Sequence, residues 1–106
     1  MQASILVVES HHDLRSAIVS AFAREKYACD AVLTGEAALS MLREHAYDYI
    51  LVDDDEDTAA TALLNELVSR PNAPKLVLLT EFERTDGVPF LRKPFDSKEL
   101  LSKVSD

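Results

Sequence analysis

Residues 49–52, Tyr-Ile-Leu-Val, form a short apolar run that ends at the acidic block of residues 53–57, Asp-Asp-Asp-Glu-Asp. A continuous apolar run of this length is typical of a strand buried on both faces of a parallel sheet. Two further runs of this kind occur at residues 5–8, Ile-Leu-Val-Val, and residues 76–79, Leu-Val-Leu-Leu. We therefore predict that these three runs are the central strands of one parallel sheet.

The segments between these runs carry apolar residues at helical spacing. Helices are predicted around residues 14–22, 38–46 and 63–68 and after Asp96, and weaker strands at residues 28–32 and 88–92. Thr58 and Asp96 are the candidate N-caps of the last two helices. Glu99 stands three residues after Asp96, which completes a capping-box pattern.

This alternation of strands and helices predicts an α/β fold with a flavodoxin-like, doubly wound sheet. We expect five parallel strands in the order 2-1-3-4-5, with helices on both faces. Only residues 81–87 separate the fourth strand from the fifth, whereas a complete crossover needs at least about 10–12 residues. The fourth helix is therefore expected to be shortened or absent, within a single domain that covers residues 1–106.

The composition limits the classes of partner. The chain has 11 Lys and Arg against 19 Asp and Glu, and this net charge of −8 disfavours nucleic acids and anionic membranes. No apolar run exceeds four residues, and no basic region precedes an apolar stretch at the N-terminus. A single cysteine, Cys29, excludes an internal disulfide. We expect a cytoplasmic protein with no nucleic-acid or membrane partner.

Polar side chains follow the carboxyl ends of four predicted strands: Glu9, Asp53, Thr80 and Lys93. In a doubly wound sheet the ligand crevice lies at these ends. Two carboxylates can hold a hard cation such as Mg²⁺, and a hydroxyl with an ammonium group can bind a tetrahedral anion. A site with both parts suits phosphoryl transfer onto an Asp carboxylate.

Five segments in order resemble the receiver domain of two-component response regulators over essentially the whole chain. They are residues 5–9 (Ile-Leu-Val-Val-Glu), 26–39, 47–53 (Tyr-Asp-Tyr-Ile-Leu-Val-Asp), 76–80 (Leu-Val-Leu-Leu-Thr) and 90–95 (Phe-Leu-Arg-Lys-Pro-Phe). The last segment, in which Lys-Pro-Phe stands between a strand and a capped helix, is the most specific. The resemblance implies a role in two-component signalling, with a histidine kinase or a histidine phosphotransfer domain as the partner.

The resemblance also implies a role for each residue at the strand ends. Asp53 would accept the phosphoryl group from a phosphohistidine, and Lys93 would neutralise its oxygens. The peptide bond between Lys93 and Pro94 would be cis. Thr80 and Phe90 would be the switch between two conformational states.

Two positions depart from the family pattern in the metal site and its surroundings. The resemblance implies an Mg²⁺ site at Glu9, Asp53 and, as a substitute ligand, Asp55, but Ser10 stands where the family has a metal-binding Asp. Glu81 follows Thr80 where a small residue is usual. These departures predict weak Mg²⁺ binding and slow phosphorylation. The adjacent His11 and His12 are expected to be solvated residues of a first helical turn.

Two other classes stay open. One is a degenerate receiver that binds a protein partner without being phosphorylated. The other is an enzyme, because Asp53 and Asp55 faintly resemble the motif of haloacid-dehalogenase phosphatases, although Asp57 stands where those enzymes have Thr or Val. We therefore do not expect an enzyme. A homodimer is a further candidate assembly.

Overall fold

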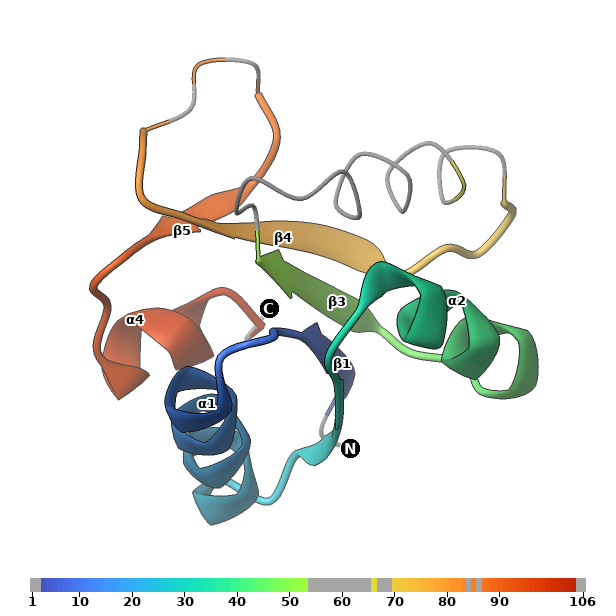
Figure 1. Cartoon of the computed structure of the whole chain (residues 1–106), viewed down its shortest axis with the longest axis horizontal. Coiled ribbons are helices and arrows are strands. Elements are labelled where there is room, and N and C mark those ends of the chain that lie inside the picture. The colour runs from blue at the N-terminus through green and yellow to red at the C-terminus, as the bar shows by residue number, and fades with distance from the viewer. Residues whose placement is uncertain (1–2, 54–65, 67–69, 84, 86, 105–106) are drawn as a thin grey trace.

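The five strands of the structure, a computed structural model, form one parallel sheet in the order β2-β1-β3-β4-β5 (Figure 1). Residues 3–53, 66, 70–83, 85 and 87–104 are described. The strands are β1 (Ser4–Val8), β2 (Ala28–Val32), β3 (Tyr49–Asp53), β4 (Lys75–Thr80) and β5 (Phe90–Arg92). The predicted fold class and strand order are confirmed, with the mixed strand β2 at one edge and the apolar strands inside.

Three helices cover the two faces of the sheet in the described part of the chain. They are α1 (His12–Arg24), α2 (Gly35–Glu44) and α4 (Ser97–Ser102). Helices α1 and α4 lie side by side on one face, and α2 lies on the other (Figure 1). The helix predicted around residues 63–68, with Thr58 as its N-cap, lies outside the described residues apart from Glu66.

Alternate residues of the central strands face opposite sides of the sheet, as the strand period requires. In β1, Ile5 and Val7 pack with α1 and α4, whereas Leu6 and Val8 pack with α2. The largest buried side chain of α1 is Phe22, which is fully buried in the first of these two cores. Both faces of β1 are therefore covered, which explains its unbroken apolar sequence.

Side chains cap two helix starts, and the cap at Asp96 was predicted. The Asp96 side chain accepts a hydrogen bond from Glu99 N at 2.8 Å, and the Glu99 side chain accepts one from Asp96 N at 3.3 Å. This capping box fixes the start of α4 directly after the strand-end segment that carries Lys93. The Thr34 hydroxyl likewise accepts a hydrogen bond from Ala37 N at the start of α2.

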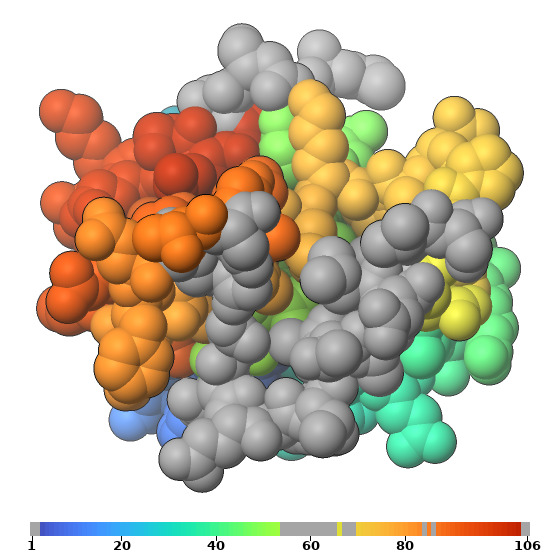
Figure 2. Space-filling view, turned by 90° about the horizontal axis from the view of Figure 1, so that it is seen from above, coloured from blue at the N-terminus to red at the C-terminus, as the bar shows by residue number. Residues whose placement is uncertain are grey.

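The connection between β4 and β5 is short. Its described residues, 81–83, 85 and 87–89, form no helix, as the length of the segment predicts. Strand β5 begins at Phe90, two residues later than expected, because Pro89 accepts a hydrogen bond from Leu78 N but has no N–H to donate to the ladder. In Figure 2 the coloured segments after β4 (orange to red) lie on one side of the visible face, and the yellow residues just before β4 lie on the other. None of the helices among the described residues is long and apolar enough to cross a membrane.

Candidate functional site

Three strand ends bring charged side chains together at the carboxyl edge of the sheet. Glu9 follows β1, Asp53 ends β3 and Lys93 follows β5. Lys93 Nζ lies 2.7 Å from Asp53 Oδ1 and 3.5 Å from Glu9 Oε1. The side chains of Glu9, Asp53 and Lys93 are 0%, 8% and 16% exposed. We call these three residues the charged triad.

The cis Lys93–Pro94 peptide bond that the resemblance implied is present. Backbone pairing also holds this segment in place, because Lys93 N donates a hydrogen bond of 2.7 Å to Thr80 O. The end of β5 is therefore registered against the end of β4, and the Lys93 side chain reaches across to Asp53 on β3.

The two carboxylates of the triad titrate together. Burial raises the pKa of Asp53, and the neighbouring Glu9 raises it further, while Lys93 opposes both. Burial alone would raise the pKa of Glu9 as well, but hydrogen bonding to Asp53 and to the His11 backbone, with the charge of Lys93, lowers it. Two buried carboxylates facing one ammonium group leave an excess of negative charge that a bound cation would neutralise.

His11 is a member of this cluster that the sequence interpretation missed. Its Nδ1 lies 3.2 Å from Glu9 Oε2, and its backbone N–H donates to the same oxygen at 3.3 Å. His11 is solvated as expected, with a side chain that is 65% exposed, but its contact with Glu9 was not predicted. Because His11 is the residue just before α1 and not inside the helix, the rule that adjacent helical residues diverge did not apply to it.

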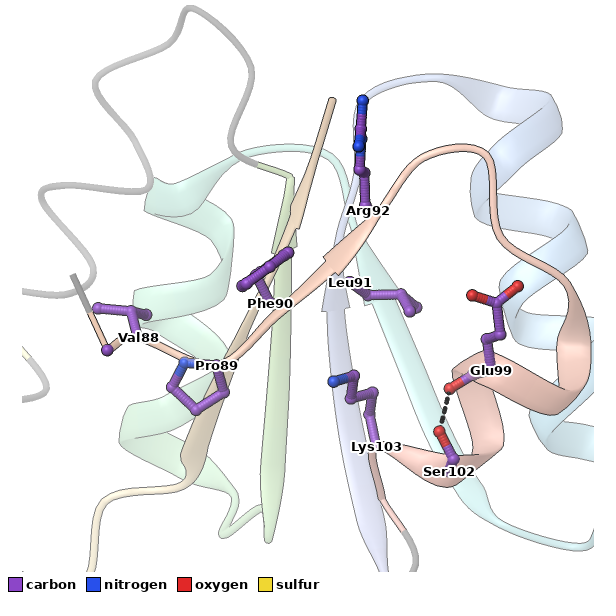
Figure 3. A pocket seen from close by; sticks show the side chains of 9 residues that line it. Val88, Pro89, Phe90, Leu91, Arg92, Glu99, Ser102 and Lys103 are labelled. Atoms are coloured by element: carbon purple, nitrogen blue, oxygen red, sulfur yellow. Dashed lines mark hydrogen bonds between the residues drawn. The ribbon is translucent and has the colours of Figure 1, made fainter. Parts of the chain in front are cut away.

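The predicted switch residues lie on β4 and β5. The Thr80 side chain is buried, and its hydroxyl accepts a hydrogen bond from Phe82 N at 3.1 Å. Phe90 is half-buried and packs with the core on the α2 face, whereas its neighbour Leu91 points toward α4 (Figure 3). Thr80 pairs with Arg92, the last residue of β5, in the ladder between β4 and β5. Lys93 comes directly after Arg92, so Thr80 and Lys93 lie at neighbouring strand ends.

The structure describes the two residues that depart from the family pattern, Ser10 and Glu81, but not the predicted substitute ligand Asp55. Ser10 is exposed, and only its backbone carbonyl takes part in a hydrogen bond among the described residues, from Arg15 Nη1 at 3.2 Å. Glu81 is exposed at the start of the β4–β5 connection. Asp55, the predicted substitute metal ligand, lies outside the described residues.

The metal that the family implies can be tested against the residues present. Glu9 Oε1 is buried and has no hydrogen-bond partner among the described residues. The carboxylates of Glu9 and Asp53, with His11, offer ligand atoms that all lie within 4.8 Å of one another. A divalent cation therefore fits this site, although Ser10 adds no carboxylate to it.

Several hollows lie outside the charged triad. One of about 560 Å³ opens beside β5 and α4, with Phe90, Arg92, Glu99 and Lys103 among its lining residues (Figure 3). A smaller one of about 160 Å³ lies between α1 and α4, where Leu14, Ala17 and Phe95 line it.

Comparison with known proteins agrees with this geometry. The family model described as the response regulator receiver domain matches residues 5–105. The transcriptional regulatory proteins CutR of Streptomyces coelicolor and of Streptomyces lividans are each 28% identical to the chain over 110 residues, covering 94% of this chain and 51% of the relative. The chain thus spans about half the length of the curated relatives it matches.

Solved structures share the fold. The chemotaxis response regulator CheY4 of Vibrio cholerae superposes with a TM-score of 0.87 at 17% identity, over 97% of this chain and 96% of that chain. A CheY-like response regulator receiver domain from Methylobacillus flagellatus gives 0.84 at 22% identity, over 99% and 100%. The chain belongs to the response regulator receiver domain family, and it is a module of two-component signalling.

Proposed function

We propose that this receiver domain accepts a phosphoryl group on Asp53. The observation that carries the proposal is the 2.7 Å ion pair between Lys93 Nζ and Asp53 Oδ1, set against the fully buried Glu9. An Asp carboxylate held in this way is oriented for attack, and the ammonium group is placed where charge accumulates on the transferred group.

The proposed step is a displacement at phosphorus. A carboxylate oxygen of Asp53 forms a bond to the phosphorus atom, and the bond between phosphorus and the donor imidazole nitrogen breaks. The electron pair of that bond stays on the imidazole, which keeps or takes up the proton that makes it neutral. Lys93 stabilises the phosphoryl oxygens throughout, and a divalent cation, when bound, supplies further positive charge.

The conformational response is proposed to start at Thr80. Its hydroxyl is engaged by Phe82 N at 3.1 Å, so a turn toward a phosphoryl group on Asp53 requires this hydrogen bond to break. Phe90, half-buried on the neighbouring strand, is the residue proposed to follow Thr80 inward. The switch is then a shift between two states, driven by the new acceptor oxygens.

The phosphoryl donor is proposed to be a histidine kinase or a histidine phosphotransfer domain. The hollow between α1 and α4 offers an apolar surface for it, with Leu14 and Ala17 on α1 and Phe95 after the Lys93–Pro94 bond. Ala17 is exposed, so Ala17→Arg is expected to block docking and slow transfer while the core stays intact.

Arg15, in the first turn of α1, is unsuitable for this test. Its guanidinium group donates hydrogen bonds to Glu9 O at 3.0 Å and to Ser10 O at 3.2 Å. Substituting it would disturb the loop beside the charged triad. His12, which is exposed, remains a usable probe, and unchanged transfer in both Ala17→Arg and His12→Glu variants would exclude docking on this face.

A second candidate function is supported by Ser10 and Glu81. The exposed Ser10 contributes no carboxylate to the metal site, and Glu81 adds negative charge directly after Thr80. The missing carboxylate weakens binding of a cation, and the added negative charge of Glu81 repels a dianionic phosphoryl group. The alternative proposal is therefore a degenerate receiver that binds its partner without being phosphorylated.

The proposed partner class and location follow from the net charge of the chain and from its membership of the receiver domain family. The net charge of −8 favours a protein partner over nucleic acid or an anionic membrane, and we place the domain in the cytoplasm with its donor. The domain is proposed to receive a group and not to act as an independent enzyme. A homodimer is testable by sedimentation with and without a phosphodonor.

The proposed acceptor is tested by transfer from a phosphorylated histidine phosphotransfer domain carrying a radioactive label. The label should move to the native chain and not to the Asp53→Asn variant. Label that reaches Asp53→Asn equally would show that another residue is the acceptor. A native chain that binds the donor but takes up no label would favour the degenerate receiver.

A further inference from the structure

His11 places an imidazole nitrogen in the carboxylate cluster. Its Nδ1 lies 3.2 Å from Glu9 Oε2, and the ligand atoms of Glu9, His11 and Asp53 all lie within 4.8 Å of one another. The three residues come from two neighbouring strand ends, because Glu9 and His11 follow β1 and Asp53 ends β3. One nitrogen and two carboxylate groups thus converge at one point of the crevice.

The spacing of these atoms suits a coordination shell. Ions such as Zn²⁺ hold nitrogen and oxygen ligands at about 2.0–2.2 Å in a tetrahedral shell, so two ligand atoms of one shell are about 3.3–3.6 Å apart. The 3.2 Å separation of His11 Nδ1 and Glu9 Oε2 lies just below this range. The wider spread of the whole cluster, up to 4.8 Å, means that a bound ion would draw one side chain inward.

An independent observation points to a ligand at the same place. Glu9 Oε1 is fully buried and has no hydrogen-bond partner among the described residues, and Lys93 Nζ lies 3.5 Å from it. Buried polar atoms nearly always have a partner, in the protein or in a bound species. A cation beside Glu9 would provide that partner.

The chemistry of the donor set decides which cation is favoured. Mg²⁺ selects sites made of oxygen ligands and keeps several waters, whereas imidazole favours borderline ions such as Zn²⁺ and Co²⁺. Ser10 brings no carboxylate, and His11 brings a nitrogen. We infer that the acidic site of this chain binds a borderline divalent cation of the Zn²⁺ class through Glu9, His11 and Asp53, in preference to Mg²⁺. This inference rests on the proposed function in one respect: it names the cation of the site at which Asp53 is proposed to be phosphorylated.

The inference is tested by isothermal titration of the metal-free full chain with Zn²⁺ alone and with Mg²⁺ alone at neutral pH. The test variant is His11→Ala, with His11→Gln as a second variant. The matched control is His12→Ala, because His12 is the adjacent exposed histidine and contacts Arg15 instead of the carboxylates. Circular dichroism confirms that each variant is folded.

Loss of the nitrogen ligand should weaken Zn²⁺ binding by about tenfold or more and leave Mg²⁺ binding within about twofold, while His12→Ala changes neither. Co²⁺ bound to the native chain should show an absorption spectrum that His11→Ala alters and His12→Ala does not. Equal weakening of Zn²⁺ and Mg²⁺ in His11→Ala would overturn the inference, because His11 would then only position Glu9. A Zn²⁺ affinity that depends on His12, or on neither histidine, would overturn it too.

These results separate the metal inference from the proposed function, because no phosphodonor is present in the titration. A chain that is phosphorylated on Asp53 but binds Zn²⁺ independently of His11 loses only the inference. A chain that binds Zn²⁺ through His11 but is never phosphorylated loses only the proposed function.

Discussion

Lys93 Nζ lies 2.7 Å from Asp53 Oδ1, so the ion pair joins the ends of two strands, β5 and β3, that are separated in the sheet by β4. The pair is mostly buried, and it leaves Glu9 as a second, fully buried carboxylate 3.5 Å from the same ammonium group. This arrangement makes Lys93 the residue on which the charge balance of the site depends.

Removal of that ammonium group should therefore be costly. Lys93→Met removes the ammonium group that lies between the carboxylates of Asp53 and Glu9. We therefore expect the free energy of unfolding to fall by about 3 kcal/mol at neutral pH. Urea denaturation measures this loss. Lys93→Arg, which keeps the charge, is the control and should lose less than half as much.

The stability of Lys93→Met should depend on pH in a defined direction. Without Lys93, repulsion between the carboxylates adds to the effect of burial that already raises the pKa of Asp53. A carboxyl group whose pKa is raised on folding binds its proton more tightly in the folded state, so the stability of Lys93→Met should rise as the pH falls from about 8 to about 5. A constant difference from the native chain over this range would contradict the coupling.

The capping box of α4 gives a local test of the segment that follows Lys93. Asp96→Ala removes the side-chain acceptor that Glu99 N uses at 2.8 Å, and we expect a loss of about 1 kcal/mol in unfolding free energy. Asp96→Ser keeps an acceptor oxygen and should restore most of the loss. Equal destabilisation by both variants would show that the negative charge, and not the cap, is what matters.

Cys29 gives a test that is independent of the charged site. Burial, with the charge of Asp30, raises the pKa of its thiol to about 11. Because the thiolate is the reactive form, alkylation by iodoacetamide should be slow at neutral pH and should still rise about tenfold per pH unit between pH 9 and pH 10. Mass spectrometry follows the reaction, with the urea-unfolded chain as the control. A rate that levels off near pH 9 would contradict the raised pKa.

The fold was predictable because its signals are local and repeated. Four-residue apolar runs such as Ile5–Val8 can be buried only where both sheet faces are covered, and the predicted connection of residues 81–87 is too short for a helical crossover. Strand order then follows from which strands are apolar throughout. The fifth strand was predicted to begin at residue 88 but begins at Phe90, because the sequence pattern does not show that strand pairing starts only after Pro89.

The site was predictable only in part. Glu9, Asp53, Thr80 and Lys93 stand at strand ends, so topology alone gathers them. The contacts of His11 and Arg15 were not predicted because they depend on how the loop before α1 turns back on Glu9, which spacing does not encode. Their contacts are with a side chain two residues away and with two backbone carbonyls.

Mg²⁺ affinity should respond to the missing carboxylate. Ser10→Asp adds a charged oxygen ligand beside Glu9, so we expect Mg²⁺ to bind about tenfold more tightly than to the native chain. Titration calorimetry with Mg²⁺ alone measures the change. Ser10→Asn, which adds a neutral side chain of the same size, is the control, and an equal gain in both variants would show that charge is not the cause.

The most direct test of the central claim is the intact mass of the chain after treatment with a small phosphodonor and Mg²⁺. The native chain should be modified slowly or not at all, because Ser10 and Glu81 oppose the reaction. The Ser10→Asp, Glu81→Ala double variant should gain the mass of one phosphoryl group, and adding Asp53→Asn should abolish that gain. A folded double variant that stays unmodified would contradict phosphoryl acceptance on Asp53 and favour a phosphorylation-independent interaction domain.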